Sequence, residues 1–320
     1  MDWASLKKRL TPKVRYRTGP FIVPSAVLEV EPGFVAGARL DRAARQVQRV
    51  AVREFGAPAF HPLPSRSDLP LGSGLQEAIR SVVETIDVGS GSLGLLLPDG
   101  VVRVGVLAFE TLPSHHNEAD ELVRWRLKEL LPFDLEDARI SYQFLRKEPG
   151  NIELLAIAAR GTVLAGFEAA LDHRNGGPAL ILPATMALLP LVPETEGSAQ
   201  VLVHVCSGWV TTVVVVGDRV CLWRNRDLEG SASAGQINDV AREVARVLAS
   251  ARDHFKVEVE RVWLCVRPPL DLDVAGELSR RFARPVTPLI TTPSKVLPEA
   301  ERVTCARIGA TFEGLVMNPS

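Results

Sequence analysis

Residues 26–40 read AVLEVEPGFVAGARL, and the two apolar, β-prone runs on either side of the Glu-Pro-Gly turn predict a β-hairpin. A similar stretch, AQVLVHVCSGWVTTVVVV, occupies residues 199–216 and again predicts two strands. Strands and helices alternate after each of these hairpins, which gives a weak internal repeat. Because 320 residues exceed the usual size of one hydrophobic core, the repeat predicts an α/β protein of two lobes.

A polar segment at residues 194–198 separates the two halves and is expected to be a linker. After the first hairpin, residues 41–55 are expected to be helical, although their alternating arginines and valines also resemble a strand. Further on, a helix, two strands and a helix form a compact α+β unit. The expected parts are a basic N-terminal segment (1–24), a first lobe (25–196) containing an inserted subdomain (about 101–174), and a second lobe (197–320) with a closing helix (305–315).

The composition excludes several classes of function. With 37 basic and 38 acidic side chains, the net charge of −1 gives no reason to expect nucleic-acid binding. The four cysteines lie far apart without zinc-ligand spacing, so we expect buried thiols in a reducing compartment. No secretory signal opens the chain and no apolar run is long enough to cross a bilayer, which predicts a cytoplasmic protein.

The N-terminal segment has the pattern of a short amphipathic helix. Its apolar face and basic flank favour contact with an anionic membrane surface. A frayed tail is the alternative, since twelve residues are marginal for an isolated helix. The residues of this candidate membrane-surface segment are Trp3, Leu6, Lys7, Lys8, Arg9 and Leu10.

Motifs that carry catalysis are missing from the sequence. The glycines of residues 89–94 match G-x-G-x-x-G, but a strand follows them where a dinucleotide site requires a helix. His115 and His116 have no second cluster of ligands, so no metal site is expected. The sequence contains no nucleophile elbow, Walker loop or kinase signature, and we expect no catalytic residues.

Several local strings in the middle of the chain form a recognisable series. An acidic helix start, Glu118-Ala-Asp-Glu-Leu-Val-Arg-Trp, is followed by Leu131-Pro-Phe-Asp and by the strand Ser141-Tyr-Gln-Phe-Leu. Leu155-Ala-Ile-Ala-Ala-Arg and Arg307-Ile-Gly-Ala continue the series. This series resembles the PilM family, the cytoplasmic actin-like proteins of type IV pilus assembly. The resemblance implies an actin-like (ribonuclease H-like) two-lobed α/β fold with an inserted α+β subdomain.

The same resemblance locates a nucleotide cleft whose usual residues are replaced. Actin-like ATPases carry an Asp-x-Gly turn in each lobe, where the carboxylate orders Mg²⁺ and backbone N–H groups approach phosphate. By the resemblance, Glu29 takes the aspartate position of the first lobe, Glu31 takes the glycine position and Gly33 ends the turn. Glu31 would repel phosphate, and Pro32 lacks an N–H donor.

The second lobe departs from the pattern in a similar way. His204 and Cys206 stand at the aspartate and glycine positions, so magnesium loses a hard oxygen ligand. The adenosine-binding turn appears as Val266-Arg-Pro-Pro, in which two prolines prevent a close backbone approach. The remaining candidate cleft residues are Ser207, Gly208, Thr211, Thr212, Pro268 and Pro269.

The resemblance therefore implies a scaffold rather than an enzyme, without a required cofactor. The implied role is to bind the cytoplasmic tail of a bitopic PilN-like membrane protein, together with other pilus or secretion platform proteins, at the cytoplasmic face of the inner membrane. The tail is expected beside the inserted subdomain, where it could add to a strand edge. One alternative is the cytoplasmic portion of a GspL-like type II secretion protein, which should continue into a transmembrane helix. Another is an actin-like protein that binds ATP and Mg²⁺.

Overall fold

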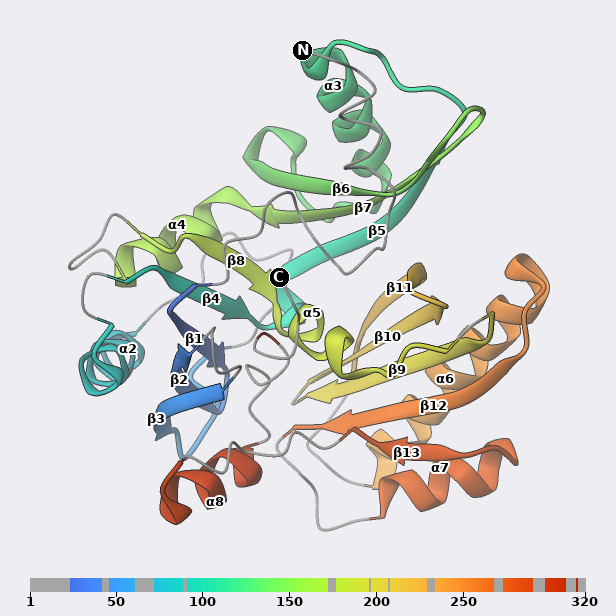
Figure 1. The fold of residues 1–320 in the computed structure, drawn as a ribbon. Coiled ribbons are helices and arrows are strands. Elements are labelled where there is room, and N and C mark those ends of the chain that lie inside the picture. The colour runs from blue at the N-terminus through green and yellow to red at the C-terminus, as the bar shows by residue number, and fades with distance from the viewer. Residues whose placement is uncertain are drawn as a thin grey trace.

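The structure is a computed structural model, and it shows two five-stranded sheets with a third, smaller sheet above them (Figure 1). No helix among the residues it describes is long and apolar enough to cross a membrane. The described residues are 24–41, 46–60, 72–88, 91–171, 177–195, 197–206, 208–228, 234–267, 273–289, 297–308 and 315.

The first sheet has the strand order β3-β2-β1-β4-β8. Strands β1, β2 and β3 form an antiparallel meander, while β4 and β8 run parallel to β1. Two helices, α2 and α4, cover its outer face and a short helix, α5, follows its last strand. The elements are β1 (Ala26–Glu31), β2 (Phe34–Asp41), β3 (Gln46–Glu54), α2 (Ser73–Ile86), β4 (Leu93–Leu97), α4 (Gly161–Leu171), β8 (Leu180–Pro183) and α5 (Ala184–Leu188).

The second sheet repeats this arrangement with the order β11-β10-β9-β12-β13. Its first three strands are again an antiparallel meander, and β12 and β13 run parallel to β9. The internal repeat predicted from the two hairpins is therefore present as two sheets of identical topology. The elements are β9 (Ala199–Cys206), β10 (Trp209–Val216), β11 (Arg219–Asp227), α6 (Ala234–Phe255), β12 (Val259–Val266), α7 (Val274–Phe282), β13 (Val286–Pro288) and α8 (Glu299–Ile308).

The inserted subdomain lies between β4 and α4, at a point where the second lobe has no counterpart. Its three antiparallel strands have the order β5-β7-β6, and helix α3 packs on one face. Strand β5 lies against β11 of the second sheet, so the insert contacts both lobes. Its elements are the 3-10 turn η1 (Asp99–Val101), β5 (Val102–Phe109), α3 (His116–Leu127), the 3-10 turns η2 (Lys128–Leu130) and η3 (Leu135–Asp137), β6 (Ala138–Glu148) and β7 (Asn151–Arg160).

Alternation along the strands divides the apolar residues into an outer core for each lobe and one central core. In β1, Leu28 and Val30 face α2 and α4, whereas Val27 faces the other lobe. In β9, Val203 faces α6 and Leu202 faces inward. The inner side chains of both sheets form one continuous cluster, so the two lobes share a core.

Two expectations about single elements are corrected. Residues 46–54 form β3 rather than a helix, because their backbone pairs with β2 along the whole strand. The closing helix expected at 305–315 begins earlier, at Glu299, and residues 309–314 lie outside the described part. This helix, α8, contacts β3 of the first sheet, and Glu301 accepts a hydrogen bond from the backbone N–H of Val50 (3.0 Å).

Candidate functional site

The inner ends of β1 and β9 carry polar side chains among otherwise apolar neighbours. Glu29 and His204 are fully buried, and Glu31 and Cys206 are nearly so. Each of these strands is central in its sheet, with a neighbour on both sides, so the side chains project into the space between the lobes. Polar groups in such a position need hydrogen-bond partners inside the protein.

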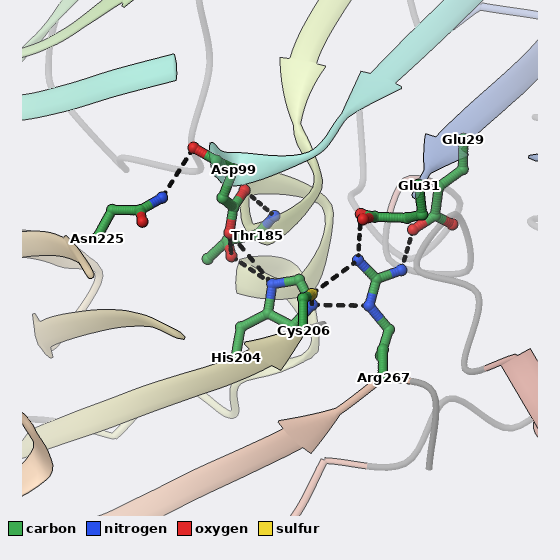
Figure 2. A network of polar contacts seen from close by, with 8 residues as sticks. All are labelled: Glu29, Glu31, Asp99, Thr185, His204, Cys206, Asn225 and Arg267. Atoms are coloured by element: carbon green, nitrogen blue, oxygen red, sulfur yellow. Dashed lines mark hydrogen bonds and ion pairs between the residues drawn. The ribbon is translucent and has the colours of Figure 1, made fainter. Parts of the chain in front are cut away.

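Arg267, the residue directly after β12, supplies most of those partners (Figure 2). Its Nη1 donates to Glu29 Oε1, and its Nη2 donates to Glu31 Oε1 at 2.8 Å. Its Nε donates to His204 Nε2 at 2.7 Å. A backbone bond from Arg267 N–H to the carbonyl of Val205 (2.7 Å) holds the residue in place. The guanidinium thus joins acids of the first lobe to a histidine of the second.

Asp99 makes a corresponding connection from the first lobe. It lies in η1, just after β4, and its carboxylate accepts hydrogen bonds from the hydroxyl and from the backbone N–H (3.0 Å) of Thr185. Its Oδ2 lies 3.2 Å from Nδ1 of His204 in the second lobe. The amide of Asn225, on β11, donates to the carbonyl of Asp99 at 2.8 Å. Figure 2 shows this carboxylate and Arg267 on opposite sides of the imidazole ring.

The hydrogen bonds define the protonation state of His204. Nε2 accepts from Arg267, so the ring proton lies on Nδ1, facing Asp99 and the Thr185 hydroxyl (2.6 Å). Burial, together with the charge of Arg267, lowers the pKa of His204, and the ring is neutral. Burial alone would raise the pKa of Asp99, but the hydrogen bonds from His204 and Thr185 outweigh it and lower that pKa.

Glu31 and Cys206 are held in their neutral forms. Burial raises the pKa of Glu31 to about 8, although the charge of Arg267 opposes the shift. Burial also raises the pKa of the Cys206 thiol well above its ordinary value. At neutral pH Arg267 and Asp99 are ionised, and Arg267 forms an ion pair with Glu29.

Thr185, His204 and Asp99 have the residue types of a hydrolytic triad but not its geometry. In a triad the two imidazole nitrogens face the nucleophile and the acid separately. Here the hydroxyl and the carboxylate both lie on the Nδ1 side, while Arg267 takes Nε2. All three side chains are fully buried, and the hydroxyl proton is directed to the carboxylate. The arrangement holds structure together and does not activate a nucleophile.

The structure brings together some of the cleft residues predicted from sequence and leaves others apart. Gly33 and Gly208 lie in the turns after β1 and β9, and Gly208 has a φ of +93°, which favours glycine. Thr211 pairs with His204 in the sheet and shares its inner face, whereas Thr212 lies on the opposite face of β10. Ser207, Pro268, Pro269 and the N-terminal set Trp3, Leu6, Lys7, Lys8, Arg9 and Leu10 lie outside the described residues.

Four members of the network were missed by sequence reasoning: Asp99, Thr185, Asn225 and Arg267. A signal for two of them exists. In each half of the repeat a charged residue closely follows the fourth strand, Asp99 after β4 and Arg267 after β12. Parallel central strands end at one edge of a sheet, so such residues are expected beside the end of the first strand.

Known proteins resemble this chain in fold rather than in sequence. No family model and no curated protein matches the sequence. Among solved structures, a chain of the PilM-PilN type IV pilus biogenesis complex is similar over 92% of this chain and 97% of its own, with a TM-score of 0.72 and 16% identity. A Bacteroides thetaiotaomicron protein with actin-like ATPase fold and unknown function has a TM-score of 0.53 and 9% identity, covering 83% of this chain and 90% of its own. The chain has an actin-like ATPase fold.

The actin-like fold confirms the architecture that the sequence resemblance implied: two lobes of the same topology, with an α+β subdomain inserted in the first. The cytoplasmic domain of EpsL, an inner membrane component of the type II secretion system of Vibrio cholerae, is also similar, with a TM-score of 0.44 and 12% identity over 81% of this chain and 94% of its own. Within the actin-like fold, the polar network lies at the ends of β1 and β9, between the lobes.

Proposed function

We propose that the protein is a non-catalytic actin-like scaffold of the inner-membrane platform for type IV pilus assembly, and that it binds the cytoplasmic tail of a bitopic PilN-like membrane protein. The fold shared with a chain of the PilM-PilN complex and the sequence series in the inserted subdomain support this assignment. The observation that carries the non-catalytic part is the position of Arg267.

The residues around Arg267 do not fit Mg·ATP. Magnesium requires hard oxygen ligands and a site of negative charge. The Glu29 carboxylate is already bound to the guanidinium, and His204 presents a nitrogen that accepts from the same group. A buried cation at the ends of both central strands would repel a second cation, because charges inside a protein are weakly screened. We infer that Arg267 replaces the metal as the positive charge between the lobes.

A surface for the tail is indicated by the outer strand of the inserted subdomain. Strand β6 pairs only with β7 among the described residues, so its other edge has backbone groups available to an added strand. On this strand the side chain of Gln143 is 7% exposed, yet neither its Nε2 nor its Oε1 has a hydrogen-bond partner in the described part of the chain.

The position of Gln143 makes the unpartnered amide informative. It lies opposite Leu155 in the β6–β7 pair, so its side chain points to the sheet face that packs towards the lobes and away from α3. A buried amide without partners destabilises a protein by about 1–3 kcal/mol. A peptide in extended conformation offers both an N–H and a C=O, and rotation of the Gln143 side chain towards the edge of β6 would let such a peptide satisfy both amide atoms. We therefore assign Gln143 to recognition of the tail backbone.

The test is a calorimetric titration of the full chain with a synthetic peptide of the cytoplasmic tail of the PilN-like protein from the same genome. We expect binding, and we expect Gln143→Leu to weaken it about 30-fold, the equivalent of two neutral hydrogen bonds of about 1 kcal/mol each. The leucine should not destabilise the free protein, because it removes a buried unsatisfied amide. Ser141→Ala, an exposed position on the same strand, is the matched control.

The outcomes separate the proposed roles. Absence of binding by the wild-type chain would overturn the tail-binding role, and equal binding by Gln143→Leu would overturn the assignment of the residue. The non-catalytic role is tested separately with Mg·ATP, for which we expect neither binding heat nor phosphate release. Turnover of ATP would favour the ATP-binding alternative. Binding of a type II secretion partner tail in place of the pilus tail would favour the GspL-like alternative.

The proposed location is the cytoplasm, peripheral to the inner membrane. A scaffold that binds the tail of a bitopic partner is held at the membrane by that partner. The basic N-terminal segment would add a direct contact with anionic lipid. Binding of the full chain to vesicles containing phosphatidylglycerol, compared with a chain in which Lys7 and Lys8 are glutamate, tests this contact; equal binding by the two chains would exclude it.

A further inference from the structure

Two charged residues of the central network, Asp99 and Arg267, each contact the lobe to which they do not belong. Asp99 follows the fourth strand of the first lobe and contacts His204 on the first strand of the second lobe. Arg267 follows the fourth strand of the second lobe and contacts Glu29 on the first strand of the first lobe. The two sheets have the same topology, so these contacts are reciprocal. In each lobe the charged residue that follows the fourth strand contacts the first strand of the other lobe.

Both contacts lie in the shared core, which makes separation of the lobes unfavourable. Asp99, Glu29 and His204 are 0% exposed and Arg267 is 3% exposed. Opening the space between the sheets would remove the His204 partner of the buried Asp99 carboxylate and the Glu29 partner of the buried Arg267 guanidinium together. Breaking the buried Arg267–Glu29 charge pair is strongly destabilising, because it leaves an uncompensated charge in a medium of low polarity, and breaking the Asp99–His204 contact removes a hydrogen bond from a buried carboxylate.

The Asp99–His204 contact lies where the inserted subdomain begins. The turn η1, which contains Asp99, leads directly into β5. Asn225 of β11 donates to the carbonyl of Asp99, and Arg219, at the other end of β11, forms an ion pair with Glu153 of β7. The inserted sheet is therefore fixed to the second lobe through the same strand that faces the network.

We propose that the Asp99–His204 and Arg267–Glu29 contacts form a reciprocal latch that holds the two lobes closed without nucleotide and, through η1, sets the position of the inserted subdomain. In an actin-like ATPase the ligand between the lobes is external, whereas here both connecting charges belong to the chain. The latch is independent of whether a tail peptide binds, so it goes beyond the function proposed above.

The experiment compares the full-length wild-type chain with Arg267→Met and Asp99→Asn by small-angle X-ray scattering and hydrogen exchange. Each substitution removes one charge and keeps the approximate shape of the side chain. We expect a larger radius of gyration and at least tenfold faster exchange over residues 26–31 and 199–206 in both variants. For Asp99→Asn, faster exchange should extend into β5. Arg280→Met, which breaks the exposed pair with Glu277, is the control and should match the wild type.

The proposal would be overturned by exchange rates in both variants that stay within twofold of the wild type. It would also be overturned if Mg·ATP made the wild-type chain more compact, because a closed latch leaves no further closure for a ligand to produce. If Arg267→Met does not fold, the isosteric Asp99→Asn variant decides the question. Absence of peptide binding by a chain that shows these responses would refute the tail-binding role alone.

Discussion

Glu31 gives the most direct test of the electrostatics between the lobes. Its pKa of about 8 in the folded protein lies well above the ordinary glutamate value of 4.5, because burial penalises the charged form. Between these values the folded protein holds a proton that the unfolded chain has released. The contribution of Glu31 to the free energy of unfolding is therefore fully present below pH 4.5. It decreases as pH rises towards 8, by about 1.4 kcal/mol per pH unit where the slope is steepest.

From pH 6 to pH 8 the predicted decrease in the free energy of unfolding is about 2 kcal/mol, since the slope flattens as the folded carboxyl begins to ionise. Glu31→Gln replaces the protonated carboxyl with a neutral amide of the same shape, whose oxygen can still accept from Arg267. The variant should lack this part of the pH dependence. Urea unfolding at several pH values, with the exposed Glu84→Gln as control, measures the difference. Parallel stability profiles for the wild type and Glu31→Gln would refute the reasoning.

Two further predictions concern packing and thiol chemistry. Gly37→Ala should lower the thermal midpoint, because an added Cβ would lie 2.5 Å from Val82 Cγ1 on α2; an unchanged midpoint in calorimetry would show that this helix adjusts freely. In the folded chain Cys206 and Cys265 should resist an aromatic disulfide reagent at pH 8, since burial raises both thiol pKa values, that of Cys265 to about 11. Mass spectrometry should find them labelled only after denaturation, and rapid labelling of the native protein would contradict their burial.

Hydrophobic periodicity predicted much of the fold, because most helices and strands have a recognisable pattern within their own residues. The helix α6 carries Val240, Val244, Val247 and Ala251 on one face, and all are buried against the second sheet. The misjudged segment, β3, has the exposed arginines Arg49 and Arg53 on a strand beside β2. This segment is a strand because it pairs with β2, and the helical propensity of its residues gives no information on that pairing.

The candidate site was less accessible to sequence reasoning because its members meet across the lobes. Glu29 and Glu31 were singled out together, and their shared inner face follows from strand alternation. Their partner, Arg267, is 238 residues from Glu29 in sequence, and its only sequence signal is its place directly after the fourth strand of the second half. Gln143 was seen only as part of a string, since burial without partners is a property of the folded sheet.

The central core shared by the two sheets bears on how this chain could have arisen and on how it can be divided. Two copies of one five-stranded unit point to a duplication, yet neither copy retains a self-sufficient interior. Inner side chains of each sheet pack in one cluster with those of its sister unit, and each unit contributes a charged side chain with a hydrogen-bond partner in the other. The halves have thus become obligate complements: a fragment ending at the linker would expose an apolar face and an unneutralised charge, and the two fragments should gain structure only when mixed.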